Sequence, residues 1–485
     1  MKNPLIYEIN IRLLLRGGNH EWLLDIPASY WEAIRNKGFR YIWLMGVWET
    51  CESVVPKHCF QEGLIRSYTK ALKDWTKEDV IGSPYAINAY RPSKIIGTMQ
   101  DLKAFRDLLR SLGMGLILDF VPNHFSADSE LIAKHPEYFL EVSEDIYNGE
   151  PHTFYRPENG GGKYFAHGRD PFFPAWTDTI QVNFTNPGLR EYYRETLTEL
   201  TEICDGVRCD MAMLALNNVF NNTWGMLLEN NDAMPAELWT ELISAVKNKR
   251  NDFLFIAEAY WDLEWELQQM GFDYTYDKKL LDRLKDSTAD KVRDHLKAEE
   301  AYQMKSLRFI ENHDEERAVT ALGKDKSLAA AVIIATIRGM RFFHHGQFQG
   351  KKIKLPVQLG REPKEQVNEQ VEAFYEQLLG IVHNELFRAG EWQMLECKRV
   401  WDNNYSNSNM MAWQWSLDSE RALVVVNYSG STSQCRLPLD VSSYDEQFDL
   451  TDVLNNKTYR RYREELLLPG LFVELGPWQS HIFRY

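Results

Sequence analysis

Four apolar runs in this chain each lead to a carboxylate, at Asp119, Asp210, Glu258 and Asp314. Such runs, for example residues 116–118, have the length and composition of strands that are buried on both faces of a parallel sheet. A carboxylate at the end of a buried strand loses hydration energy unless it finds a partner. We therefore expect the ends of these four strands to converge on one polar site.

Strand-like runs alternate with helix-like segments through most of the chain. Apolar residues at helical spacing predict a helix over 99–113, and an Asn-Pro start predicts another over 187–200. Eight strands with intervening helices indicate a parallel sheet that closes into a (β/α)₈ TIM barrel. The predicted strands are residues 5–10, 40–47, 115–121, 206–212, 253–259, 272–277, 306–313 and 340–346.

Two regions depart from this alternation. Residues 125–180 are rich in Gly, Pro and aromatic residues and are too long for a structureless loop, so we expect a small inserted domain after the third strand. Residues 384–485 contain short alternating strands separated by turn-like segments, which predicts a C-terminal antiparallel β-sandwich. Residues 1–124 and 181–383 would then form the barrel.

The charge balance limits the partners of the chain. Its 55 basic and 70 acidic residues give a net charge of −15, which argues against nucleic acid and anionic membranes. Glu8 and Arg12 interrupt the apolar N-terminus, so we expect a first strand there rather than a signal peptide. Without an apolar run long enough to span a bilayer, the protein is expected to be cytoplasmic.

Cysteine and histidine spacing gives little sign of a metal site. The six cysteines form no CxxC pair and show no zinc-like spacing, so we expect free thiols. His344 and His345 are adjacent, and neighbours on a strand point to opposite faces, so they are poorly placed to share a metal ion.

The motifs at the strand ends resemble a known family. The segments DFVPNH (119–124), GVRCD (206–210), AEAY (257–260) and ENHD (311–314) occur in the order of the four signature segments of the α-amylase superfamily, glycoside hydrolase family 13. QVNFTNP (181–187) is similar to a fifth segment of that family. The resemblance also covers the barrel, the insertion and the C-terminal sandwich.

This resemblance implies a retaining mechanism. Asp210 would be the nucleophile, Glu258 the general acid/base, and Asp314 the third acid, which grips sugar hydroxyls. Retention requires the first two carboxylates to lie roughly 5–5.5 Å apart. Arg208 is two residues before Asp210, hence on the same strand face, where it would favour the ionised nucleophile. Glu258 has no adjacent cation in sequence, which suits a raised pKa.

The resemblance also implies roles for polar and aromatic neighbours. His124 and His313 would hydrogen-bond sugar hydroxyls at the cleavage site, and Tyr85 in GSPYAINAY would stack beneath the sugar ring. Asp119 would brace Arg208, although a purely structural role is an equal alternative. Tyr90 is expected to be a core residue.

One departure from the family pattern follows the nucleophile. Many α-amylases have a Lys–His pair where this chain has Met213 and Leu214, and that His carbonyl often binds a structural calcium ion. Asn123 matches another calcium ligand of the family but defines no site alone. No cofactor is expected to be required, calcium stays open, and so does the specificity for the acceptor.

The resemblance favours a retaining glycoside hydrolase that cleaves α-glucosidic bonds, chiefly α-1,4 bonds of maltooligosaccharides or α-glucans. The alternative is a transglycosylase, such as a glucanotransferase, a maltosyltransferase or a trehalose-forming isomerase. A non-catalytic carbohydrate-binding relative would be expected to have lost a catalytic carboxylate, and this chain has lost none. For an unrelated barrel enzyme that uses metal or phosphate chemistry, the sequence lacks a plausible set of ligand residues. Linkage, chain-length preference, endo or exo action and oligomeric state are left open.

Overall fold

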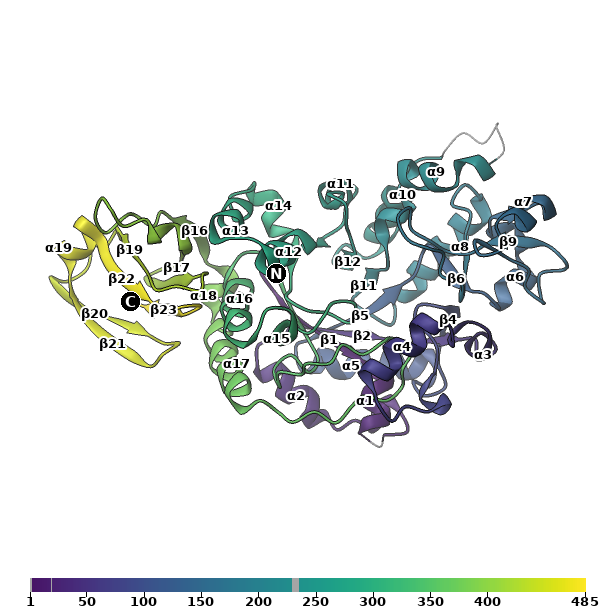
Figure 1. Cartoon of the computed structure of the whole chain (residues 1–485), viewed down its shortest axis with the longest axis horizontal. Coiled ribbons are helices and arrows are strands. Elements are labelled where there is room, and N and C mark those ends of the chain that lie inside the picture. Colours follow the sequence, from purple (N-terminus) through teal and green to yellow (C-terminus); the bar gives the residue numbers. More distant parts are fainter. Residues whose placement is uncertain (1, 19, 229–234) are drawn as a thin grey trace.

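A closed barrel of eight parallel strands forms the centre of the molecule (Figure 1). The computed structural model describes residues 2–18, 20–228 and 235–485. Each barrel strand falls within one of the predicted runs, so the predicted TIM barrel is confirmed. In their order around the barrel the strands are β1 (Leu5–Asn10), β2 (Tyr41–Met45), β5 (Gly115–Phe120), β11 (Gly206–Cys209), β12 (Leu254–Ala257), β13 (Tyr274–Tyr276), β14 (Ser306–Arg308) and β15 (Met340–His344).

Burial of both strand faces explains why these runs carry so few polar residues. Leu116, Ile117 and Leu118 of β5 are fully buried, and each such side chain contributes about 1.5–3 kcal/mol. Helices pack around the strands, among them α1 (Ile11–Gly17), α2 (Ala28–Asn36), α5 (Met99–Ser111), α8 (Pro187–Leu200), α9 (Asn217–Trp224), α10 (Leu238–Lys249), α11 (Glu264–Gln269), α12 (Lys278–Asp286), α13 (Ala289–Leu296), α14 (Glu300–Met304), α15 (Ala318–Ala321), α16 (Lys324–Thr336) and α17 (Glu369–Val382).

Both predicted helices are confirmed, and their N-termini explain where they begin. α8 starts at Pro187, and the Asn186 side chain accepts a hydrogen bond from the Leu189 amide at 3.0 Å. At the start of α5, Thr98 and Asp101 cap one another's backbone amides, forming a capping box.

Two long connections build up one end of the barrel. After β2, strand β3 (Trp48–Thr50) pairs antiparallel with β4 (Ile87–Pro92), and α3 (Val54–His58) and α4 (Glu62–Ala71) lie between them in sequence. After β5, strand β6 (His124–Ser126) pairs with β10 (Thr179–Gln181). The segment predicted as an inserted domain holds α6 (Glu130–Lys134), α7 (Glu144–Gly149) and a sheet of β7 (Glu141–Val142), β9 (Tyr164–Ala166) and β8 (Phe154–Tyr155).

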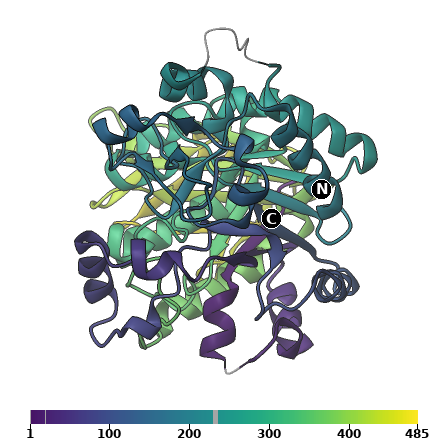
Figure 2. The ribbon, with the colours of Figure 1, turned by 90° about the vertical axis from the view of Figure 1, so that its right-hand side faces the viewer.

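The C-terminal region forms antiparallel sheets at the end of the molecule that lies farthest from the inserted segment (Figure 1). Figure 2 shows these sheets behind the barrel. A second hydrophobic core, which includes Cys435, Leu437 and Val473, lies among these strands. The predicted β-sandwich is confirmed. Short α18 (Glu385–Ala389) leads into the six-stranded sheet β16 (Glu391–Leu395), β17 (Met410–Leu417), β18 (Glu420–Asn427), β23 (Ser480–Arg484), β20 (Gln447–Asp452) and β21 (Lys457–Tyr462), with β19 (Ser433–Leu437) paired to β22 (Leu471–Leu475) and α19 (Arg463–Glu465) near the edge.

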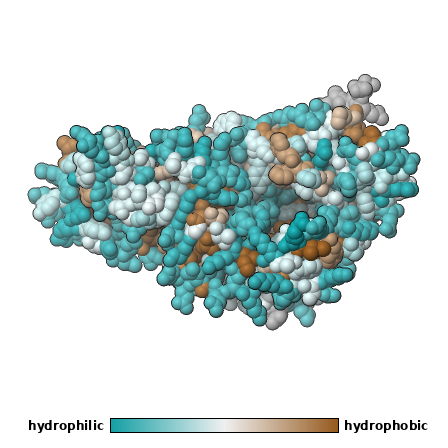
Figure 3. All heavy atoms as spheres, in the orientation of Figure 1, coloured by the Kyte–Doolittle hydropathy of each residue, from teal (hydrophilic) through white to brown (hydrophobic). Residues whose placement is uncertain are grey.

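The surface seen in Figure 3 is mainly hydrophilic, with hydrophobic residues in small patches. Among the described residues, every helix is too short or too polar to cross a bilayer.

Candidate active site

The register of three neighbouring strands brings the predicted acids together. In the parallel pairing of β11 with β5, Arg208 lies beside Asp119. On the other side of β11, Cys209 lies beside Ala257 of β12, so the next residues, Asp210 and Glu258, leave the sheet at the same level. Because the strands are parallel, their carboxyl ends open at one face of the barrel.

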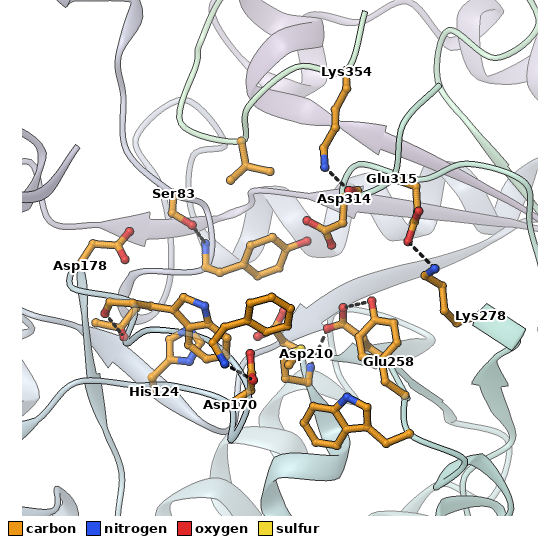
Figure 4. A pocket seen from close by; sticks show the side chains of 18 of the residues that line it. Ser83, His124, Asp170, Asp178, Asp210, Glu258, Lys278, Asp314, Glu315 and Lys354 are labelled. Atoms are coloured by element: carbon orange, nitrogen blue, oxygen red, sulfur yellow. Dashed lines mark hydrogen bonds and ion pairs between the residues drawn. The ribbon is translucent and has the colours of Figure 1, made fainter. Parts of the chain in front are cut away.

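A cavity of about 1010 Å³ lies at this face. Asp210, Glu258 and Asp314 all line it, and Figure 4 shows Asp314 on the wall opposite the other two. Tyr85 and His124 line it too, whereas Arg208, His313 and Asp119 lie behind the wall. Further lining residues come from the inserted segment and from the loops after β12, β13 and β15; they include Asp170, Phe173, Trp176, Asp178, Tyr260, Trp261, Lys278 and Lys354.

Arg208 connects the two acids that would carry the chemistry. Its Nη1 lies 2.7 Å from Asp210 Oδ1, and its Nη2 lies 2.7 Å from Glu258 Oε2. Nη1 is also 3.4 Å from Asp119 Oδ1, the contact through which Asp119 would brace Arg208. The guanidinium is buried among three carboxylates, so its position fixes theirs.

Burial sets the protonation of Glu258. Removal from water, together with the charges of Asp210 and Asp314, raises the pKa of this carboxyl to about 7 against the opposing effect of Arg208. The sequence shows no cation beside Glu258, yet the fold supplies Arg208. Two other groups hold the carboxylate: the Met211 amide donates to Oε2 at 2.7 Å, and the Tyr260 hydroxyl donates to Oε1 at 2.8 Å.

The other two carboxylates beside Arg208 are shifted in the same direction. Burial raises the pKa of Asp210, and the adjacent Arg208 guanidinium opposes this rise. Burial likewise raises the pKa of Asp119 to about 7, again against Arg208. Asp210, with the shorter contact to the guanidinium, is the better placed of the two to be ionised.

His313 holds the opposite wall of the cavity. Its Nε2 lies 2.9 Å from Asp314 Oδ2 and 2.8 Å from the Tyr85 hydroxyl. Enclosure disfavours the charge on Asp314, but His313 more than offsets this and holds the pKa of that carboxyl well below its usual range. The Tyr85 ring stacks on His313, with centroids 5.4 Å apart. His313 is therefore placed to act through Asp314 and Tyr85.

His124 is held where the inserted segment meets the barrel. Its ring lies 5.3 Å from that of Trp176, and burial lowers its pKa to about 4. A neutral imidazole at the cavity wall can both donate and accept hydrogen bonds, which suits contact with hydroxyl groups. Tyr90 packs in the core as expected and exchanges hydrogen bonds with the Val121 backbone.

At the position that the family resemblance links to calcium, two side-chain amides bind one another. Asn123 and Gln181 pair through their amides, with Gln181 Nε2 donating to Asn123 Oδ1 at 3.0 Å and Asn123 Nδ2 donating back at 3.2 Å. Calcium requires six to eight oxygen ligands, usually with carboxylates among them. In the part of the chain that the structure describes, no group of three or more His, Cys, Asp or Glu side chains could hold a metal ion. A neutral amide pair fills this position.

Sequence reasoning missed several residues of the site. Tyr260 and Met211 contact Glu258, and their roles follow only from the fold. Glu8 of β1, in the interior of the barrel, contacts Nδ1 of His313. A charged residue in the middle of the buried run LIYEIN was the available signal for Glu8.

Comparison with known proteins agrees with this geometry. The family model described as alpha amylase, catalytic domain, matches residues 77–393. The chain belongs to the α-amylase family. Within it, alpha-amylase 3 of Dictyoglomus thermophilum is 25% identical over 291 residues, which cover 55% of this chain and 53% of that relative.

Proteins named for other activities also resemble this chain. A cyclomaltodextrin glucanotransferase of Geobacillus stearothermophilus is 22% identical over 272 residues, which cover 53% of this chain and 36% of that relative. The matched region thus spans about half or less of these two relatives. The solved structure of maltogenic alpha-amylase AmyB from Thermotoga neapolitana shares the fold, with a TM-score of 0.68, 20% identity and coverage of 100% of this chain and 98% of that one.

Proposed function

We propose that this chain is a retaining glycoside hydrolase that cleaves α-glucosidic bonds, chiefly α-1,4 bonds of maltooligosaccharides or α-glucans. The observation that carries the proposal is that Asp210, Glu258 and Asp314 line one cavity, with Arg208 bound to the first two. Membership of the α-amylase family supports the substrate class.

The first half-reaction follows from the unequal environments of two carboxyls. Asp210, ionised beside Arg208, attacks the anomeric carbon and forms a glycosyl ester as the glycosidic C–O bond breaks. Glu258, whose pKa of about 7 keeps a proton available near neutral pH, gives that proton to the departing oxygen. The two steps together leave Glu258 ionised.

In the second half-reaction Glu258 acts as the base. It takes a proton from water, the water oxygen attacks the anomeric carbon, and the bond to Asp210 breaks. Asp314 stays ionised beside His313, so its carboxylate can bind sugar hydroxyls and favour the positive charge of the oxocarbenium-like transition state.

Glycosyl transfer is the second candidate, because a sugar hydroxyl can replace water in that step. An aromatic pair, of which Trp261 lines the cavity, favours it as an alternative. Phe172 and Trp261 meet edge to face with ring centroids 5.0 Å apart, and flat apolar rings offer a surface for an acceptor sugar. The similarity to a glucanotransferase also supports this candidate.

The test is product analysis on a maltooligosaccharide series, with and without an added acceptor sugar. Proton NMR of the first product formed gives the anomeric configuration, and we expect the α-anomer. Longer products that need the acceptor would favour transfer. An initial β-anomer would contradict retention, and unchanged substrate would contradict the proposal as a whole.

A further inference from the structure

A fully buried carboxylate lies beneath the cavity and has no part in the mechanism above. Glu8 stands in the middle of β1, and its side chain is closed off from solvent. Its Oε1 contacts Nδ1 of His313, while its Oε2 lies 3.8 Å from Nε2 of His344. A buried carboxylate is costly unless a positive charge accompanies it, so one of these two histidines is expected to be charged.

The contacts of His313 identify it as the charged partner. Its Nδ1 faces the Glu8 carboxylate, and its Nε2 faces Oδ2 of Asp314 at 2.9 Å. An ionised carboxylate can only accept hydrogen bonds, so Nδ1 carries hydrogen towards Glu8. The Tyr85 hydroxyl lies 2.8 Å from Nε2 and can accept from it or donate to it, and the charge of Asp314 beside the same nitrogen favours a hydrogen there as well. Burial disfavours this imidazolium, but Asp314 and Glu8 raise the pKa of His313 well above its usual range.

His344 has the opposite arrangement. Its Nδ1 lies 2.9 Å from Nη1 of Arg317, and a guanidinium can only donate, so this nitrogen must be the acceptor. Burial and the Arg317 charge both lower the pKa of His344, which leaves its ring neutral. Arg317 is itself paired with Glu311 at 2.6 Å. The charge of Glu8 is therefore balanced by His313.

We propose that Glu8 is a positioning residue whose carboxylate keeps His313 as a doubly protonated imidazolium, which in turn holds Asp314 and Tyr85 at the sugar-binding wall. The inference rests on the proposed function for the roles of Asp314 and Tyr85. It adds a series of charged contacts from Glu8 on β1 through His313 to Asp314 at the cavity. Through this series, a residue in the interior of the barrel fixes the position of the third acid.

Four of the groups that face His313 from neighbouring elements are carboxyl groups, whose negative charge favours its positive charge. The facing groups are Glu8 on β1, Tyr85 before β4, Asp119 on β5, Asp210 after β11, Asp314 beside it and neutral His344 on β15. Trp43 of β2 packs edge-on against the imidazole, with ring centroids 5.6 Å apart, and limits access of water.

The first test observes His313 directly in the wild-type protein. Nitrogen-15 NMR of the imidazole, assigned by the signal that disappears in His313→Gln, distinguishes the imidazolium from either neutral form. We expect His313 to stay doubly protonated well above pH 7. A neutral His313 at pH 7 would overturn the inference, whatever reaction the protein catalyses.

The second test uses Glu8→Gln, which keeps an oxygen to accept from Nδ1 but removes the charge. The pH dependence of kcat/KM is measured with α-maltosyl fluoride, whose leaving group needs no proton from Glu258. Loss of Glu8 lowers the pKa of His313, so the alkaline limb should move to lower pH, with about a tenfold loss above the limb for each unit of displacement.

Glu311→Gln is the matched control, because it also removes a buried carboxylate of this region but one bound to Arg317. It should leave the imidazolium signal of His313 in place. If Glu8→Gln folds by circular dichroism and keeps both the wild-type limb and the wild-type imidazolium signal, Glu8 is structural only. If wild-type protein does not turn over the fluoride, the proposed function fails, whereas the NMR result still stands on its own.

Discussion

Asp210 and Glu258 are bound by the two terminal nitrogens of a single guanidinium, each at 2.7 Å from Arg208. The rigid fork of arginine thus sets the spacing between the proposed nucleophile and the proposed acid/base. Two carboxyls bound to one cation nevertheless need opposite protonation states. Burial raises the pKa of Glu258 to about 7 even though the Met211 amide and the Tyr260 hydroxyl donate to its oxygens, so it can hold its proton near neutral pH and release it during the reaction.

Arg208→Lys should lower kcat by about 100-fold or more, because an ammonium is a point charge and does not reproduce the fork between two carboxylates. Activity on maltooligosaccharides measures the effect, and thermal unfolding shows whether the fold survives. Arg110→Lys is the control, since Arg110 also pairs with a carboxylate, Asp205, but at the other end of β11. Equal losses in the two variants would contradict the special role of Arg208.

The activity on maltooligosaccharides should fall as the pH rises through about 7. The reason is that Glu258 must be protonated, and its pKa in the folded protein is raised to about 7. Asp210 must be ionised, so a second fall is expected as the pH drops through its raised pKa.

Glu258→Gln should lower turnover by about 10²–10⁴-fold on these substrates and spare glycosyl fluorides. Equal losses on both substrate classes would argue against an acid role.

Trp261→Ala should reduce transfer relative to hydrolysis. Trp261 lines the cavity, and both it and Asp262 adopt a left-handed backbone, with φ of 65° and 62°, which is unfavourable for bulky residues. A stacking contact of about 1 kcal/mol corresponds to about fivefold in acceptor binding. Chromatography of the products with added maltose measures the ratio. Trp22→Ala, an exposed tryptophan outside the cavity lining, should leave the ratio unchanged.

A chelator should leave the unfolding temperature unchanged. The Asn123–Gln181 amide pair joins the two ends of the inserted segment, where the chain leaves and re-enters the barrel, without a carboxylate, so we propose that no calcium ion is needed there. Differential scanning calorimetry with and without EDTA gives the answer. A lower unfolding temperature in EDTA that calcium restores would contradict this proposal.

The barrel could be predicted because its strands are buried on both faces. Such strands consist of consecutive apolar residues, which can be recognised in the sequence. The three acids could be predicted because each one follows such a run at the same end. The contacts of Glu8 and Tyr260 could not, since they depend on how distant strands and loops meet. The contact between Arg208 and Glu258 could not be predicted for the same reason, because it depends on the pairing of β11 with β12 in the barrel.

Trapping of the covalent intermediate tests the central claim most directly. The protein is incubated with 5-fluoro-α-glucosyl fluoride, whose glycosyl ester hydrolyses slowly, and digested peptides are analysed by mass spectrometry. We expect one added 5-fluoroglucosyl group on Asp210 and none in Asp210→Asn. Modification of another carboxylate, or full turnover by Asp210→Asn, would contradict the assignment of Asp210 as the nucleophile.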